Sequence, residues 1–249
     1  MTTTVFILSL VSFSAGFIDS IAGGGGLIMM PALLISGVAP QMVLGTNKFA
    51  STFGTGMSLI NYIRNRRIVW KIVGIGIFFT LLGAFLGSKT ILIFPNDTIG
   101  KIIVFLLPFA MIGTLIPRKE HDFEVELLIN NLYIKVPLIC LMLGFYDGFF
   151  GPGTGSFLIL AFYLVIGLNL VQASATAKVF NLTSNISALI VFLIERKVIF
   201  FLGLPLAIAN IAGNYLGSHL VIQKGANIVK TFLIISLVIL LIYLGWKYF

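Results

Sequence analysis

The chain has 249 residues, of which 59% are hydrophobic and only 10% are charged, and its mean hydropathy is +1.10. A soluble domain has roughly a quarter of its residues charged, so this composition excludes a water-soluble domain and indicates an integral membrane protein. The net charge of +8 comes from 16 Lys and Arg against 8 Asp and Glu. We interpret it as a signal of membrane topology, and not of nucleic-acid binding.

Apolar runs follow one another along the chain and predict about eight membrane crossings, if each of the two shorter runs joins the run before it. The runs cover residues 5–22, 27–38, 41–63, 70–94, 98–117, 132–150, 156–168, 170–194, 198–222 and 228–246. The first run lacks the basic start of a signal peptide, so we expect it to be a retained helix. The fold class is therefore all-α: a polytopic helical membrane protein without a separate catalytic domain.

The second half of the chain repeats the first at an offset of 128 to 130 residues. The matched pairs are Asp19 with Asp147, Gly23 with Gly151, Lys48 with Lys178, Arg66 with Arg196, Gly83 with Gly213, and Gly87 with Gly217. The last two pairs form GxxxG motifs, which we expect to serve close helix packing. We predict two repeated four-helix halves: a first transmembrane repeat at 1–117, a polar linker at 118–135 and a second transmembrane repeat at 136–249.

A glycine-rich break interrupts the first helix of each half, at Ser20–Gly26 and Phe150–Gly155. Glycine costs about 1 kcal/mol relative to alanine inside a helix, and the backbone groups that a break frees within a membrane need partners. The apolar residues after each break can start a short helix, whose N-terminal amides favour an anion. The candidate substrate-binding residues at the breaks are Gly23, Gly24, Gly25, Gly26, Gly151, Gly153, Thr154 and Gly155.

The breaks leave two topologies open. If each break interrupts a single crossing, the halves are parallel; if each forms a re-entrant hairpin, the halves are inverted, as is common in secondary transporters. Counting one crossing per major run places ten basic residues on one face, which by the positive-inside rule is cytoplasmic and holds both termini. The ten basic residues are Arg64, Arg66, Arg67, Lys71, Arg118, Lys119, Lys135, Arg196, Lys197 and Lys247. On these charge grounds we expect the parallel arrangement.

Lys48 and Lys178 follow the two breaks at the start of long apolar runs, and each has polar neighbours on its own helix. Such a lysine either extends to the membrane surface or lines a polar cavity, and its presence in both halves favours the cavity. The candidate substrate-binding residues here are Asn47, Lys48, Lys178 and Asn181. Asn181 and Asn185 share a helix face with Lys178, and Ser51 and Thr55 share one with Lys48.

Asp19 and Asp147 stand four residues before the first paired glycine of each break. Either carboxylate could accept a proton in a coupled transport cycle, or cap the amides that the break frees. The residues leave both roles open.

Neither metal-binding nor catalytic motifs occur in the chain. Its two histidines, His121 and His219, are far apart, and Cys140 is its only cysteine. We therefore expect neither an enzyme nor a metal or other cofactor.

The paired segments GFIDSIAGGGGLIMMPAL…GTNK and GFYDGFFGPGTGSFL…ATAKVFN resemble the sulfite exporter TauE/SafE family, also called the toluenesulfonate uptake permease family, over essentially the whole chain. The resemblance implies a carrier in a bacterial or archaeal inner membrane that moves sulfite, sulfonates, sulfoacetate or similar anions. The second copy departs from the first at Ala177, where the first has Asn47, and at Pro152, which replaces Gly24. We therefore expect the halves to contribute unequally to the site.

The resulting hypothesis is a secondary transporter for small sulfur-containing anions, driven by a proton, ion or substrate gradient. Its expected partners are a small anionic substrate and the lipid bilayer, with a homodimer left open and no nucleic acid. The alternatives are an anion channel and a structural or assembly subunit of a membrane complex.

Overall fold

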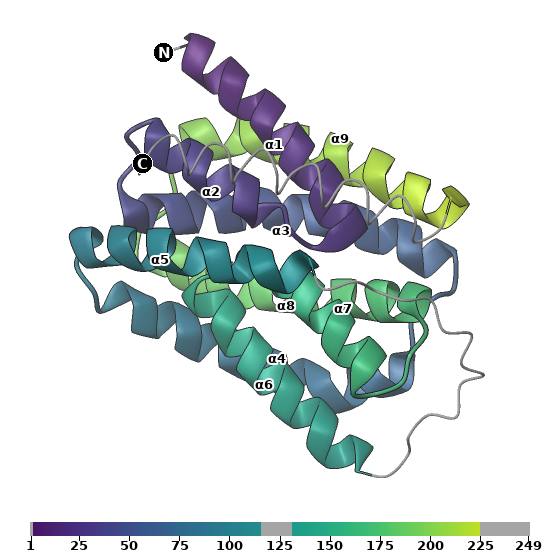
Figure 1. Ribbon diagram of the computed structural model, residues 1–249. Coiled ribbons are helices and arrows are strands. Elements are labelled where there is room, and N and C mark those ends of the chain that lie inside the picture. Colours follow the sequence, from purple (N-terminus) through teal and green to yellow (C-terminus); the bar gives the residue numbers. More distant parts are fainter. Residues whose placement is uncertain (1, 116–130, 225–249) are drawn as a thin grey trace.

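The computed structural model describes residues 2–115 and 131–224, and helices form all of the regular structure in these two ranges (Figure 1). The helices are α1 (Thr2–Ala22), α2 (Gly26–Ile35), α3 (Pro40–Arg64), α4 (Trp70–Leu92), α5 (Asn96–Leu115), α6 (Leu132–Phe149), α7 (Thr154–Leu164), α8 (Leu170–Ile194) and α9 (Phe200–Lys224). Both predicted breaks are confirmed, because α1 and α6 end there and α2 and α7 begin. Most of the predicted linker and the last apolar run, 228–246, lie outside the described residues.

Five of the described helices are long and apolar enough to cross a membrane, namely α1, α4, α6, α8 and α9. The short helices α2 and α7 are apolar but span only 10 and 11 residues. Helix α3 is 25 residues long but rich in Thr, Ser and Asn, and many of these polar side chains are buried inside the bundle. The chain is thus a multi-pass helical membrane protein, and the count of about eight crossings stays a prediction.

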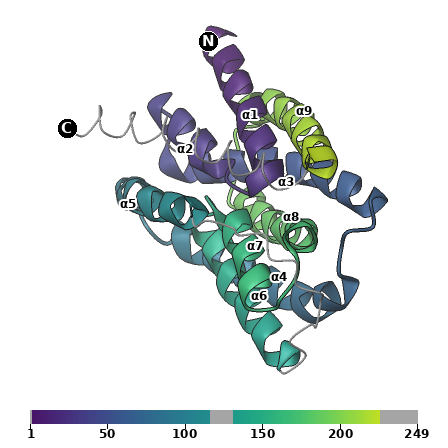
Figure 2. The ribbon, with the colours of Figure 1, turned by 45° about the vertical axis from the view of Figure 1, so that its right-hand side comes forward.

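Helices α3 and α8 lie against each other within the bundle and run in opposite directions (Figure 2). The backbone N–H of Ile199, just after α8, donates to Thr46 Oγ1 near the start of α3 at 3.1 Å. The N–H of Val69, just after α3, donates in the same way to Thr176 Oγ1 near the start of α8, also at 3.1 Å. The start of each helix therefore meets the chain that follows the end of the other. We call these two ends of the bundle the Arg196 end and the Arg66 end, after the loops at 195–199 and 65–69.

The outer helices pack in two parallel pairs that cross between the halves of the chain. Helix α1 runs along α9, where a Cβ on Gly213 would collide with the carbonyl of Phe13 and one on Gly217 with the carbonyl of Phe17. Helix α6 runs along α4, where Gly83 and Gly87 meet the backbone of Leu141 and Phe145 in the same way. Both GxxxG motifs thus allow backbones to approach closely, as predicted.

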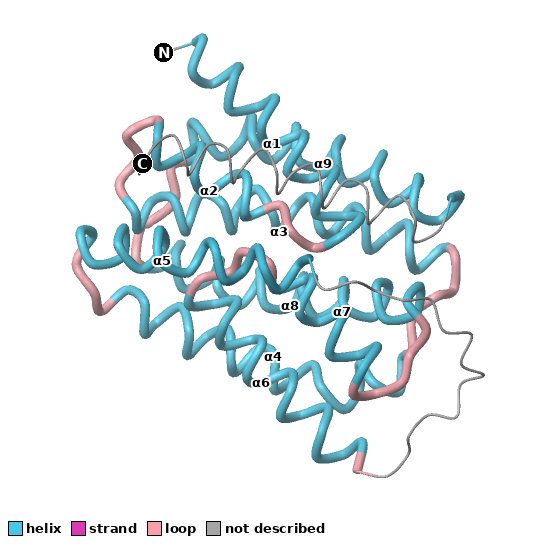
Figure 3. The backbone as a smooth tube through the Cα atoms, in the orientation of Figure 1, coloured by secondary structure: helices cyan, strands magenta, loops and turns pink. Residues whose placement is uncertain are grey.

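Each broken first helix forms a hairpin that returns to its starting end (Figure 3). Because α1 is parallel to α9, it begins at the Arg196 end, and α2 leads back there to the start of α3. Because α6 is parallel to α4, it begins at the Arg66 end, and α7 leads back there to the start of α8. The two hairpins enter the bundle from opposite ends, so matched helices of the two halves run in opposite directions.

The parallel arrangement that we expected from the charges is therefore wrong. That count treated each broken helix as a single crossing, whereas α2 and α7 reverse the chain and shift every later helix by one crossing. Lys89 shows the consequence: its Nζ lies 2.8 Å from Glu195 Oε1, beside Arg196, although the parallel arrangement places Lys89 and Arg196 on opposite faces. The basic loops around Arg66 and Arg196 lie at opposite ends of the bundle. The charge count that placed the N-terminus in the cytoplasm therefore no longer supports that placement.

Cysteine labelling from one side of the membrane distinguishes the two arrangements. In inside-out and right-side-out vesicles, we expect Arg67→Cys and Arg196→Cys to react with a membrane-impermeant maleimide from opposite sides, because both positions are exposed at opposite ends of the bundle. The wild-type chain is the control, since its Cys140 is buried and should stay unlabelled. Labelling of both variants from the same side would restore the parallel arrangement.

Candidate functional site

The two breaks meet each other in the interior of the bundle. Gly23 has a φ of +77°, and a Cβ there would collide with the backbone of Gly155 in the other break. Ser156 Oγ donates a hydrogen bond to the carbonyl of Ala22, the last residue of α1. The tips of the two hairpins are thereby held in direct backbone contact, and the carbonyl that the first break frees is satisfied by the second hairpin.

Two buried ion pairs cross between the halves beside these breaks. Lys48 Nζ lies 2.7 Å from Asp147 Oδ2, and Lys178 Nζ lies 2.9 Å from Asp19 Oδ2. The side chains of Lys48 and Lys178 are only 4% and 1% exposed, so neither reaches an end of the bundle. Removing one partner of such a pair would leave a buried charge uncompensated, which typically costs about 3–5 kcal/mol.

The remaining contacts of the Lys48 amine are with side chains. Its Nζ donates to Asn185 Oδ1 at 2.9 Å, and Asn185 Nδ2 donates in turn to Asn181 Oδ1 at 2.9 Å. Both asparagines belong to α8, on the helix face that the spacing from Lys178 predicted. Lys48 is therefore held by a network of side chains from the second half.

The Lys178 amine instead donates a hydrogen bond to a backbone carbonyl group. Besides the Asp19 carboxylate, it donates to the Asp19 carbonyl, which also accepts from the N–H of Gly23. Asp19 Oδ1 lies 3.4 Å from the N–H of Gly25, across the break. The cation satisfies a carbonyl at the C-terminus of α1 and the carboxylate faces the start of α2, the charge placement that helix dipoles favour.

A polar cavity of about 20 Å³ lies between the breaks and the two central helices, which is room for about one water molecule. Its lining consists of Asp19, Gly23, Gly26, Asn47, Lys48, Ser51, Asp147, Gly151, Gly153, Asn181 and Asn185. Nine of these were candidates from the sequence. Ser51 and Asn185 were not among them, although they follow Lys48 and Lys178 at helical spacing on the same faces. That spacing was the signal that could have found them.

The other sequence candidates lie next to the cavity without lining it: Gly24, Gly25, Thr154, Gly155 and Lys178. Thr154 Oγ1 donates to the carbonyl of Gly151, so its hydroxyl closes the turn before α7. At the start of α2, the N–H groups of Leu27 and Ile28 donate to the carbonyls of Gly24 and Gly25. These helix starts are thus partly satisfied within their own turns.

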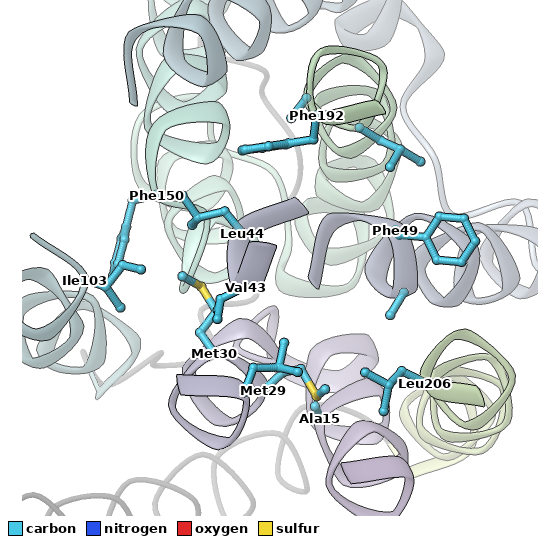
Figure 4. Packing of buried hydrophobic residues seen from close by; sticks show 14 of the residues in the cluster. Ala15, Met29, Met30, Val43, Leu44, Phe49, Ile103, Phe150, Phe192 and Leu206 are labelled. Carbon is cyan, nitrogen blue, oxygen red and sulfur yellow. The ribbon is translucent and has the colours of Figure 1, made fainter. Parts of the chain in front are cut away.

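Apolar clusters lie on both sides of the cavity, toward the two ends of the bundle. Toward the Arg196 end, side chains from α1, α2, α3, α5, α8 and α9 converge around Met30, Leu44 and Phe192 (Figure 4). Toward the Arg66 end, a second cluster includes Tyr62 and Phe180. Tyr62 and Phe192 are matched positions of the two halves and are both fully buried. The polar cavity therefore lies between two apolar layers.

The described residues contain no group of side chains arranged as a metal site. Within residues 2–115 and 131–224, no three His, Cys, Asp or Glu side chains come together as a metal site would require.

Comparison with known proteins agrees with this architecture. The profile of the family described as "Sulfite exporter TauE/SafE" matches residues 8–244. The chain belongs to this family. Nearly its whole length aligns with bacterial relatives that carry the description "Probable membrane transporter protein". The TauE/SafE chain is thus a member of a family of membrane transporters, as its paired motifs indicated.

Three relatives illustrate the match. The chain is 37% identical to "Probable membrane transporter protein ORF9" of Sinorhizobium sp, over 95% of this chain and 90% of the relative. It is 38% identical to a protein of Haemophilus influenzae, over 92% and 89% of the two chains. It is 34% identical to YfcA of Escherichia coli, over 92% and 85%. No solved structure matches the chain.

Contact between the breaks can be tested with a pair of alanine variants. Gly23 and Gly37 have similar positive φ values of +77° and +82°, but a Cβ on Gly37 meets nothing within 4 Å. Gly37→Ala should cost about 1–2 kcal/mol, the strain of a left-handed alanine. Gly23→Ala should cost about 1–3 kcal/mol more, because its methyl group also overpacks the second break. Thermal unfolding in detergent measures both, and equal losses would contradict the contact.

Proposed function

We propose that this TauE/SafE protein is a secondary carrier for small sulfur-containing anions, with its substrate site in the cavity between Lys48 and the two breaks. The observation that carries the proposal is a buried lysine surrounded by amide and hydroxyl side chains at the meeting point of two oppositely directed hairpins. An ammonium group and neutral hydrogen-bond donors are the groups that oxyanions bind. The sulfur chemistry is taken from the family's description.

The inverted arrangement supports a carrier over a channel. Inverted halves whose broken helices meet at the middle of the membrane are the architecture of many secondary transporters, in which one half moves against the other to expose the site alternately. The apolar clusters on both sides of the cavity fit a substrate-free state of such a cycle, because the cavity has room for only about one water molecule. An anion channel in a closed state would need a continuous polar path behind its gate, and here apolar side chains gather at both ends.

The full membrane arrangement also belongs to this proposal. We expect two four-helix repeats, with residues 228–246 completing the second, and the hairpins α1–α2 and α6–α7 as re-entrant elements.

The Arg66 end carries Arg64, Arg66, Arg67, Lys71 and Lys135 without an acidic side chain among the described residues. The Arg196 end pairs two of its cations with Glu195 and Asp97. By the positive-inside rule the Arg66 end faces the cytoplasm, so α1 begins on the outer face of the inner membrane.

The charges of the site favour coupling to protons. Two lysines face two carboxylates, so the site is neutral when all four groups are ionised, and an added anion would leave a buried excess of negative charge. Binding therefore needs either a proton or a cation to enter with the anion. A carboxylate that takes up the proton would provide it without a separate ion site.

Flux into proteoliposomes tests the carrier. We expect saturable uptake of labelled sulfite or sulfoacetate, and Lys48→Gln should lower it at least about tenfold, because the charge-assisted bond to the anion is lost. Lys101→Gln is the matched control, since this lysine is 77% exposed in a surface pair. The double variant Lys48→Gln/Asp147→Asn removes the buried pair without leaving a lone charge, and it should stay folded yet inactive. Flux that does not saturate would identify a channel, and wild-type flux in the Lys48 variants would refute the assigned site.

A further inference from the structure

We infer that the Asp147 carboxylate is an internal competitor of the substrate for Lys48, so that each bound anion is accompanied by one proton taken up on Asp147. The second pair, Lys178 with Asp19, has a different task and holds the first break together. The inference rests on the proposed function of the same site, and it assigns unequal roles to two ion pairs that the sequence presents as equivalent.

The two lysines differ in what they hold. Lys48 contacts the Asp147 carboxylate and the Asn185 amide, and both are side chains that can change rotamer while the backbone stays in place. Lys178 contacts the Asp19 carbonyl, which closes the last turn of α1 together with the N–H of Gly23. Withdrawing Lys178 toward a substrate would free a buried backbone group at the break. Lys48 is therefore the cation that can exchange its partner.

The two lysines also differ in their access to the cavity. Lys48 and Asp147 both line it, whereas Lys178 does not. The neighbour of Lys48, Asn47, lines it as well, but its counterpart Ala177 packs into the apolar cluster toward the Arg66 end. The polar side chains of the site thus gather around Lys48, where an anion would arrive beside Asp147.

If an anion and an ionised Asp147 both faced Lys48, one buried negative charge would be uncompensated. Asp147 is 2% exposed, so its carboxylate depends on Lys48 for compensation when charged. The other titratable groups on the elements around it are Asp19 of α1, Lys178 of α8, Tyr163 at the end of α7, Lys71 and Lys89 near the two ends of α4, Tyr62 and Arg64 near the end of α3, and Tyr133, Lys135, Cys140 and Tyr146 of α6. Lys178 forms an ion pair with Asp19, and the Tyr146 hydroxyl donates a hydrogen bond to the carbonyl of Pro152. When the anion takes over Lys48, protonation is what removes the second negative charge.

For a monovalent anion the exchange is balanced in atoms and charge. A proton from the bulk solution joins the Asp147 carboxylate to form a neutral carboxylic acid, and the anion accepts the hydrogen bonds of the Lys48 ammonium. On release the proton leaves, and the Lys48 to Asp147 ion pair forms again, so the empty site is neutral. Because binding takes up a proton, the apparent affinity for the anion rises as the pH falls, by up to about tenfold per pH unit.

Calorimetric titration of the purified full-length protein tests the inference. The probe is methanesulfonate, a monovalent anion whose own charge stays constant between about pH 5 and pH 8, the range in which the titration is run. Titrations in buffers of different ionisation enthalpy count the protons taken up per anion. We expect close to one for the wild type and for the control Asp97→Asn, whose carboxylate lies in an exposed surface pair, and none for Asp147→Asn, whose affinity should no longer depend on pH.

The outcomes separate this inference from the proposed function. Proton uptake that persists in Asp147→Asn overturns the inference while anion binding stands. Failure of the wild type to bind methanesulfonate, sulfate or sulfite overturns the proposed function. If Asp147→Asn does not fold, infrared difference spectra of the wild type and of Asp147→Glu decide: anion addition should produce the band of a protonated carboxyl group at a frequency that differs between the two proteins, and an absent or unchanged band overturns the inference.

Discussion

Two lysine–aspartate ion pairs, each joining one half of the chain to the other, are the interaction on which this structure depends. Four charges lie at the point where two hairpins meet, three of them buried and Asp19 half-buried, and each would be costly without its partner. Lys48 can meet Asp147, and Lys178 can meet Asp19, only if α3 and α8 run in opposite directions with both breaks between them. The ion pairs therefore link the fold of one half to the correct placement of the other.

The apolar and glycine-rich parts of the sequence serve this meeting point. The GxxxG motifs let α1 approach α9 and α6 approach α4 closely, which anchors each hairpin on a long helix of the opposite half. The clusters around Phe192 and Tyr62 then separate the polar centre from both ends of the bundle. The proposed carrier needs a polar site that is never open to both sides at once, and this layering fits that requirement. In our proposal the two lysines have different tasks: the Lys48 pair exchanges with substrate and the Lys178 pair maintains the break.

Much of the candidate site could be predicted because buried charges and glycines are conspicuous in an apolar sequence. The breaks, both lysines and both aspartates were found from composition and from the repeat alone. Ser51 and Asn185 were not chosen as candidates because hydroxyl and amide groups are common on membrane helices, although their helical spacing from Lys48 and Lys178 indicated them. The orientation of the halves was predicted wrongly, because a charge count cannot tell a broken crossing from a hairpin that turns back.

The sequence by itself determined that this chain is a helical membrane protein with a duplicated, glycine-broken motif of the TauE/SafE family. Hydropathy, helix-breaking residues and self-similarity are local properties, so they can be read without the fold. Only the tertiary structure decided that the halves are inverted and that each lysine is paired with the aspartate of the other half. Such pairings join residues 99 positions apart for Lys48 and Asp147 and 159 positions apart for Lys178 and Asp19. They depend on which way each hairpin turns, and no local pattern carries that information.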